Sequence, residues 1–245
     1  MLHKTKGIVL RTVKYGETSL IASIYTELFG IQSYMVKGVR QTSKKGNNKA
    51  NMFQPSAILN MVVYHNELKH LQIIKEYSWD TMYQNVYNDV IKNCVALFMV
   101  ELVTRGIKEP ESNALLFYFI ENNLRILDEA EPTVTANLPL HFSLHLARQL
   151  GFGIEDNDDE TKNILDMQAG TFTSDIPIHG FYLDGQQATA TAALLQQDNA
   201  VSLYRIKLHK QLRQQLLQAY EQFYVYHIAD FGGLKTLPVL AAILA

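Results

Sequence analysis

Alternating apolar and polar residues run through the first 79 residues and predict β-structure. In the segment TSLIASIYT, Leu20, Ala22 and Ile24 fall on one face of a strand. The other predicted strands cover residues 6–13, 30–38, 55–65 and 67–77. Five short strands in such a length are typical of a small closed barrel, of which the OB-fold is the commonest five-stranded example. An SH3-like or tudor-like barrel has a similar strand count and remains an alternative at this point.

After Trp79 the apolar period lengthens to about four, which predicts helices. The first helix is expected over residues 80–107, with Asp80 as its N-cap and Gly106 as its C-cap. Further helices are predicted over residues 111–129, 134–151, 189–197 and 202–228. The acidic stretch 152–185 is rich in glycine and turn residues, so we expect it to be irregular.

These patterns predict an α+β protein of two domains. Residues 1–79 would form the OB-fold barrel, and residues 80–245 an all-helical domain with an irregular acidic insertion at about 152–185. The hydrophobic content of 47% is enough for each part to bury a core of its own.

The composition limits the cellular location and the metal sites that we expect for this protein. Cys94 is the only cysteine, which excludes an intramolecular disulfide and a zinc cage of thiolates. The N-terminus has no apolar core typical of a signal peptide. The longest apolar run, LPVLAAILA, is far shorter than the roughly 20 residues of a membrane span. We expect a cytoplasmic protein with no membrane partner.

Charge is divided unevenly along the chain, although the total is only −2. Residues 1–79 hold 11 Lys and Arg against 4 Asp and Glu, a net charge of +7. Residues 80–245 hold 11 Lys and Arg against 20 Asp and Glu, a net charge of −9. Such a split indicates that the barrel binds a polyanion, although a solvated basic face without a partner is the alternative.

The basic residues are densest in the loop between the third and fourth predicted strands. This loop contains Lys37, Arg40, Lys44, Lys45 and Lys49 and no acidic residue. A small barrel with a basic loop suits single-stranded nucleic acid, because cations follow the phosphates and exposed aromatic rings stack on bases. The aromatic candidates are Tyr15, Tyr25, Tyr34, Phe53 and Tyr64. At least half of them should belong to the barrel core, and the turn residue Tyr15 is the one expected to be exposed.

No catalytic constellation is evident, so we expect a binding protein without a cofactor rather than an enzyme. His141 and His145 have the spacing of a helical zinc pair but lack the glutamate and a third ligand, which favours two histidines beside a core. The acidic run 155–160 lacks the pattern of a calcium loop. Cys94 lies in an apolar helical run, which favours a structural thiol over a nucleophile.

The segments KGIVLRTVKYGETSLIASIYTELFG, VKGVRQ and FQPSAILNM follow one another in the N-terminal part, and the tail FYVYHIADFGGLKTLPVLAAI ends in a short last helix. These segments resemble the bacterial recombination mediator family RecO. The resemblance extends through most of the chain and is clearest over residues 6–79 and 222–243. It rests on the order and spacing of the segments rather than on one diagnostic motif.

The resemblance implies an N-terminal OB-fold followed by a helical domain, in a protein of recombinational DNA repair that responds to DNA damage. It implies binding of single- and double-stranded DNA, annealing of complementary strands, and help in loading RecA onto DNA coated by single-strand-binding protein. The implied partners are RecR, the acidic C-terminal tail of single-strand-binding protein and, indirectly, RecF. No nucleotide hydrolysis is implied, and the location is cytoplasmic, in association with the nucleoid.

Residue by residue, the resemblance places Lys37 and Arg40 in a basic motif of the DNA-binding barrel. Arg11 and Lys14, in the first strand and its turn, follow from the same comparison. Many members of the family carry a four-cysteine zinc site about where residues 152–185 lie, but this chain has no cysteine there. His179 stands alone in that segment and does not replace the site, so no metal is expected.

A docking site for the acidic tail is predicted on one flank of the long helix. Lys207, Lys210 and Arg213 are three residues apart and would attract an acidic peptide whose terminal aromatic residue enters a nearby apolar pocket. A solvated helix flank that balances an acidic domain is an equal alternative.

Two rival functions stay open. An RNA-binding OB-fold protein has the same electrostatics, and competition between DNA and RNA oligonucleotides would separate it from a DNA mediator. A protein-interaction scaffold whose barrel binds acidic peptides would show weak nucleic-acid binding and tight peptide binding.

Overall fold

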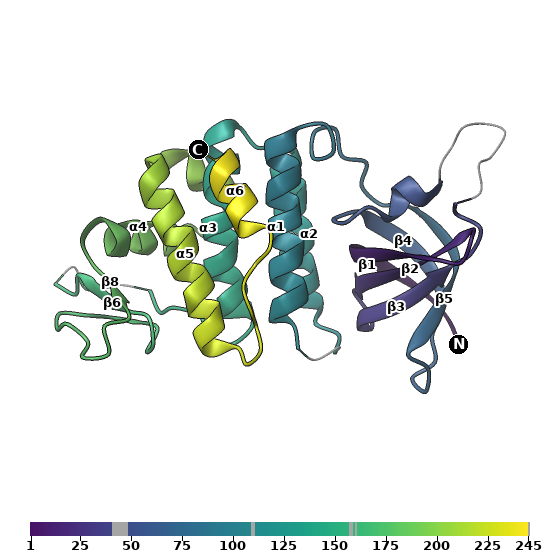
Figure 1. The fold of residues 1–245 in the computed structure, drawn as a ribbon, viewed down its shortest axis with the longest axis horizontal. Helices are drawn as coiled ribbons and strands as arrows, with labels where there is room; N and C mark the ends of the chain where they lie inside the picture. The colour runs from purple at the N-terminus through teal and green to yellow at the C-terminus, as the bar shows by residue number, and fades with distance from the viewer. Residues whose placement is uncertain (41–48, 109–110, 157–158, 160, 245) are drawn as a thin grey trace. The chain divides into compact units, whose positions relative to one another are not determined.

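The first five strands close into a barrel (Figure 1). The computed structural model describes residues 1–40, 49–108, 111–156, 159 and 161–244. The strands are β1 (Leu2–Tyr15), β2 (Ser19–Thr26), β3 (Gly30–Val36), β4 (Ile58–Tyr64) and β5 (Leu71–Trp79). Their order is β1-β2-β3-β5-β4, with β1 also paired to β4, and only the β3–β5 pairing is parallel. This is the arrangement of the OB-fold, which confirms the predicted fold class.

The alternation seen in the sequence determines which side chains fill the barrel. Leu20, Ala22 and Ile24 are buried in its core, as the pattern in β2 predicts. A short 3-10 helix, η1 (Lys49–Phe53), adds Phe53 to this core. Gly7 lies where β1 passes the core, and a Cβ there would lie 2.6 Å from a methyl carbon of Ile24, so a larger residue would force the core to shift.

In the part of the chain that the structure describes, six α-helices and a second 3-10 helix follow the barrel (Figure 1). They are α1 (Val90–Gly106), α2 (Ala114–Glu129), α3 (Pro132–Gln149), α4 (Gly185–Leu195), η2 (Ala200–Arg205), α5 (Lys210–His227) and α6 (Leu237–Ile243). The helical region and the short last helix are confirmed.

The largest differences from the predicted helices are at α1 and α5, and local capping explains both. The α1 helix begins at Val90 rather than near Asp80, because the Asp89 carboxylate accepts hydrogen bonds from the amides of Ile91 and Lys92. The predicted helix over 202–228 is divided into η2 and α5. The His209 ring caps α5 by accepting the Leu212 amide, so a new helix begins there.

The segment predicted to be irregular contains a small antiparallel sheet. Its strands are β6 (Ile164–Asp166), β7 (Thr171–Thr173) and β8 (Tyr182–Leu183), in the order β7-β6-β8. His179 lies 3.1 Å from the Asp166 carboxylate and accepts the Phe181 amide, which braces the loop before β8. Strands of two or three residues are too short to show a periodic pattern in the sequence.

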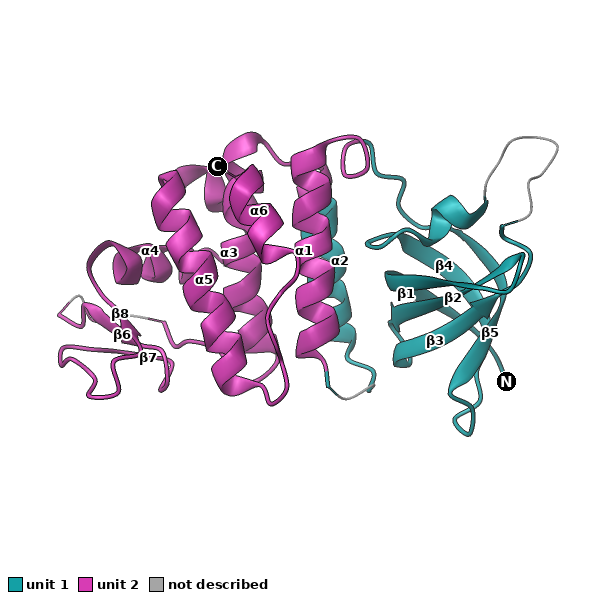
Figure 2. Cartoon of the chain, viewed as in Figure 1, with its two compact units in different colours: residues 1–84, 108–125 teal, residues 85–107, 126–245 magenta. Residues whose placement is uncertain are grey.

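The chain forms two compact units (Figure 2). The barrel unit contains residues 1–84 and 108–125, and the helical unit contains residues 85–107 and 126–245. The barrel unit therefore contains the first part of α2 as well as the five strands. None of the helices in the described ranges has the length and hydropathy needed to cross a bilayer.

Candidate nucleic-acid interface

The strand register brings the predicted DNA-binding residues of β1 and β3 to one end of the barrel. In β1, Lys14 pairs with Leu20 of β2, which in turn pairs with Val36 at the end of β3. Lys37 follows Val36 directly. Since neighbouring strands are about 4.8 Å apart, the backbones at Lys14 and Lys37 are separated by about 10 Å.

Arg11 and Lys14 are both exposed on β1, but they lie on opposite faces of the strand, because Lys14 pairs with the inward-facing Leu20. Arg11 pairs with Ser23, whose neighbours Ala22 and Ile24 point into the core, so Arg11 faces outward. Lys37 is exposed as well. Within the described ranges, no carboxylate forms an ion pair with Arg11, Lys14 or Lys37, although the β1–β2 turn contains the exposed Glu17.

Arg40 connects the start of the basic loop to the β1–β2 turn. Its guanidinium donates to the Gly16 carbonyl at 3.0 Å, and its backbone amide donates to the Thr18 carbonyl at 3.0 Å. Gly16 has a φ of 58°, a left-handed conformation that favours glycine. Arg40 thereby holds in place the turn that follows Lys14. We call Arg11, Lys14, Lys37 and Arg40 the cationic rim.

The remaining predicted residues of the loop are only partly within the described chain. Lys49 is exposed and is the first residue of η1, whose Phe53 anchors it to the barrel core. Lys44 and Lys45 lie outside the described residues.

The prediction that at least half of the five aromatic residues belong to the barrel core is wrong, since Tyr34 and Phe53 are the two that do. The expected exposure of Tyr15 is confirmed. Tyr25, Tyr34 and Phe53 are buried, while Tyr15 and Tyr64 are each 50% exposed. Tyr25 is buried outside the barrel core: its ring lies 6.0 Å from that of Phe117, and its hydroxyl donates to the Asn113 carbonyl. Burial raises the pKa of Tyr25 to about 12, so its hydroxyl stays protonated.

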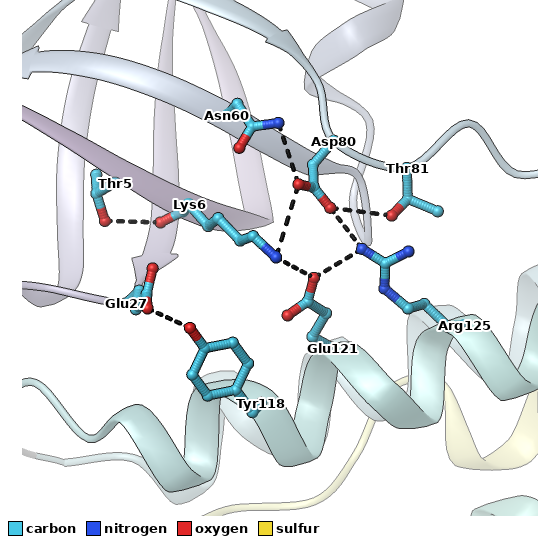
Figure 3. A network of polar contacts seen from close by, with 9 residues as sticks. All are labelled: Thr5, Lys6, Glu27, Asn60, Asp80, Thr81, Tyr118, Glu121 and Arg125. Atoms are coloured by element: carbon cyan, nitrogen blue, oxygen red, sulfur yellow. Dashed lines mark hydrogen bonds and ion pairs between the residues drawn. The ribbon is translucent and has the colours of Figure 1, made fainter.

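Lys6, on the same strand as Arg11, is neutralised by an ion-pair network within the barrel unit (Figure 3). Its ammonium lies 2.9 Å from Glu121 of α2 and 3.7 Å from Asp80. Arg125 joins both carboxylates, at 2.8 Å from Glu121 and 2.5 Å from Asp80. Burial lowers the pKa of Lys6, but the hydrogen bond and charge of Glu121 outweigh it, and the net shift is upward.

A second contact of α2 lies beside this network, where the Tyr118 hydroxyl donates to Glu27 (Figure 3). In the sequence, Lys6 is one more basic residue of the barrel, and its partners are not evident there. Glu121 is 115 positions away, so no local pattern could have indicated the pair.

The three basic residues predicted for partner binding have different environments in the helical unit. Lys207 precedes α5 and Lys210 is its first residue, and both are exposed. Arg213 donates to the carbonyls of Leu208 at 3.0 Å and Leu244 at 3.3 Å. Burial lowers the pKa of Arg213, and its contacts connect α5 to the end of α6.

The rings of the two histidines of α3 lie against each other at a tilt of 37°, with centroids 4.1 Å apart. His141 is 2% exposed, and burial lowers its pKa to about 4, with a smaller contribution from His145. No group of three or more potential metal ligands occurs in the ranges that the structure describes. The pair therefore acts as part of the core, as the sequence favoured.

The closed five-stranded barrel followed by helices defines the class of this protein as an OB-fold protein with a helical C-terminal region. The model of the recombination protein O N-terminal domain matches residues 1–83, and that of the C-terminal domain matches residues 87–238. The chain belongs to the RecO family, and membership indicates a role in DNA repair and recombination.

Full-length relatives support the assignment. The chain is 34% identical over 244 residues to the DNA repair protein RecO of Christiangramia forsetii, covering 98% of each chain. It is 33% identical over 241 residues to RecO of Bacteroides fragilis, again over 98% of each. RecO of Azobacteroides pseudotrichonymphae is 27% identical over 243 residues and 99% of each chain. The family is one of repair mediators rather than of known catalytic enzymes.

Proposed function

We propose that this protein binds DNA through the cationic rim and anneals complementary strands during recombinational repair. We further propose that it helps to load RecA onto DNA coated by single-strand-binding protein. Lys49 and the loop residues Lys44 and Lys45 extend the rim in this proposal. The protein would act on the chromosome, without a cofactor and without a covalent step.

The observation that carries the proposal is the contrast in pairing among the basic residues of the barrel. Arg11, Lys14 and Lys37 are exposed and free of carboxylate partners in the described ranges, while Lys6 is paired. An unpaired cation at the surface gains free energy by displacing counterions from a phosphate, whereas a paired one must first lose its carboxylate. The rim gathers three such cations at one end of the barrel, and this arrangement suits a polyanion.

Annealing follows from charge neutralisation. Two DNA strands repel each other through their phosphates, and a cationic surface that holds one strand lowers the barrier to the approach of a second. No side chain has to perform covalent chemistry. The rim contacts phosphates, which all sequences share, so annealing would be independent of sequence.

For the acidic tail of single-strand-binding protein we propose the flank of α5 that carries Lys207 and Lys210. Both are exposed near the N-terminus of a helix, where the helix dipole adds to their attraction for carboxylates. Arg213 supports this flank by joining α5 to the end of α6. RecR and, through it, RecF complete the proposed set of partners.

Annealing of complementary strands coated with the cognate single-strand-binding protein tests both contacts together. We expect Arg11→Glu/Lys37→Glu to abolish annealing of bare and coated strands alike. Lys207→Glu/Lys210→Glu should abolish annealing of coated strands only, because this variant loses the proposed contacts with the acidic tail and keeps the cationic rim. Lys162→Glu, at an exposed position of the helical unit, is the matched control.

Two results would contradict the proposal. One is normal annealing of bare strands by the rim variant at moderate salt. The other is a preference for RNA over DNA of the same sequence in direct competition, which would favour an RNA-binding function instead.

A further inference from the structure

An unbroken row of apolar side chains crosses the outside of the barrel. The register pairs Val13 of β1 with Ile21 of β2, Ile21 with Met35 of β3, Met35 with Ile73 of β5, and Ile73 with Tyr64 of β4. Residues paired directly across strands lie on the same face of a sheet. We call these five residues the apolar belt.

The belt faces outward over its whole length. The neighbours of Ile73, Gln72 and Ile74, are 2% and 8% exposed and point inward, so Ile73 itself must point outward. Val13 is 49%, Ile73 42% and Tyr64 50% exposed, and Ile21 and Met35 are partly exposed. Strands normally place polar residues on a solvated face, so a row of apolar residues across five strands indicates a ligand.

Polar and cationic residues border the belt on both sides. Side chains two positions along a strand share its face, so each belt residue has one such neighbour on either side. One border contains Arg11, Ser23 and Ser33 and continues through the apolar Leu71 to Asn66. The other contains Tyr15, Ser19, Lys37, Lys75 and the apolar Val62. Lys75 is paired with Glu76 at 3.4 Å, so Arg11 and Lys37 are the border cations that have no carboxylate partner in the described ranges. These border positions include two residues of the cationic rim, so the belt is continuous with the proposed phosphate contacts.

The arrangement matches one kind of occupant. A single nucleic-acid strand combines apolar base faces with a chain of anionic phosphates, and the belt with its borders offers apolar surface beside cations and hydroxyls. In a duplex the base faces are stacked on each other and only the phosphates are available. An acidic peptide would fit the cations but has no regular row of flat apolar groups.

We propose that the apolar belt is the surface on which unpaired bases lie, with Tyr64 at one end as a stacking platform and the phosphates along the border cations. This assignment rests on the proposed DNA-binding function. A base that lies with its face on the belt keeps its pairing edges free. A second strand can then test those edges for complementarity while the first strand stays bound.

The belt and the rim make separable contributions to affinity. Apolar contact with bases requires single strands and releases no counterions, so it adds affinity without adding to the salt dependence. Phosphate contact serves single and double strands alike. Removal of belt residues should therefore weaken single-strand binding by the same factor at every salt concentration.

The test compares Met35→Ser/Ile73→Ser with the wild-type protein by fluorescence anisotropy on an oligothymidine and on a blunt hairpin duplex, across a salt series. We expect the belt variant to bind the single strand about tenfold more weakly, as removal of a base contact does. Its salt slope and its duplex affinity should be unchanged. Ile176→Ser/Ile178→Ser makes the same change at exposed sites in the helical unit and should bind as the wild type does.

A second measurement reports contact with the bases directly and does not depend on the affinity of the belt variant. Tyr64→Trp adds one indole to a chain whose single tryptophan is Trp79, and its fluorescence should be quenched by oligothymidine and not by the duplex. The inference is overturned if the wild-type protein binds single strands and the belt variant binds them equally well. It is also overturned if single-strand and duplex affinity fall together. Absence of DNA binding by the wild-type protein would instead overturn the proposed function.

Discussion

Two parts of the barrel's outer surface carry similar residues and have opposite environments. Near the middle of β1, Ile8 pairs with Tyr25 and Ile58, and all three are buried although they lie outside the barrel core. Further along the same strand, Val13 is 49% exposed. The first part of α2 contacts the former area through Phe117 and leaves the latter uncovered.

The charges follow the same division. Lys6 in the covered area is held by Glu121 and Asp80, while Arg11 and Lys14 in the open area have no carboxylate partner in the described ranges. One strand therefore contains a lysine that fastens a helix and cations that are free to bind. The comparison shows that net charge overstates the binding surface, because part of it is used within the fold.

The largest expected effect is on the free energy of unfolding, which should differ between substitutions in the two apolar areas. Ile8→Ala removes a fully buried side chain and should lower the free energy of unfolding by about 3 kcal/mol. Ile73→Ala, at the exposed position, should change it by less than about 0.5 kcal/mol. Chemical denaturation followed by circular dichroism measures both. Equal losses would show that the two areas are covered alike.

The next largest effect is on DNA affinity, which should depend on Arg11 and Lys37 and not on Lys6. Arg11→Ala/Lys37→Ala should weaken binding to a single strand by roughly 100-fold at low salt, because two phosphate contacts are lost. The slope of log K against log salt should become less steep by about 1.4, at 0.7 for each contact. Anisotropy titrations at several salt concentrations give both values. Lys6→Ala serves as the control, and an equal loss of affinity there would contradict the division.

Lys6 should instead matter for stability. Lys6→Met keeps most of the aliphatic stem and removes the charge, leaving Glu121 with Arg125. We expect a loss of about 1 to 2 kcal/mol, which is less than for a buried pair because the Lys6 side chain is 30% exposed. The DNA affinity of the folded variant should equal that of the wild type. Unaltered stability would mean that the network does not hold α2.

The smallest effect concerns Arg40, which differs from the other rim residues in being tied to the Gly16 carbonyl. Arg40→Lys keeps the charge but cannot reproduce the planar guanidinium geometry. Because this bond positions the turn, Arg40→Lys and Arg40→Ala should both weaken DNA binding by a few fold in anisotropy titrations. Wild-type affinity of the lysine variant, with a shallower salt slope for the alanine variant, would show that Arg40 contacts phosphate instead.

Local periodicity was sufficient to predict the barrel. The alternation of Leu20, Ala22 and Ile24 identified the buried face of β2, and the five strands appear in the predicted order. The same pattern could not show that Tyr25 is buried under α2 while Val13 is exposed, because both lie on outward faces. That difference depends on a helix about 90 residues further along the chain.

The candidate site was predictable in its residue types and not in its geometry. The absence of acids around Lys37 and Arg40 is visible in the sequence, but the bond from Arg40 to Gly16 depends on the folded turn. The apolar belt was missed because it runs across strands rather than along them. Its signal appears only when the register of five strands is known.

Lysine acetylation with and without a bound single strand, read by mass spectrometry, tests the central claim most directly. Every lysine of the chain is compared in one sample, with no substitution. The account predicts that DNA protects Lys14, Lys37 and Lys49, while the reactivity of Lys6, Lys207 and Lys210 is unchanged. Protection confined to lysines of the helical unit, with Lys14 and Lys37 fully reactive in the complex, would contradict it.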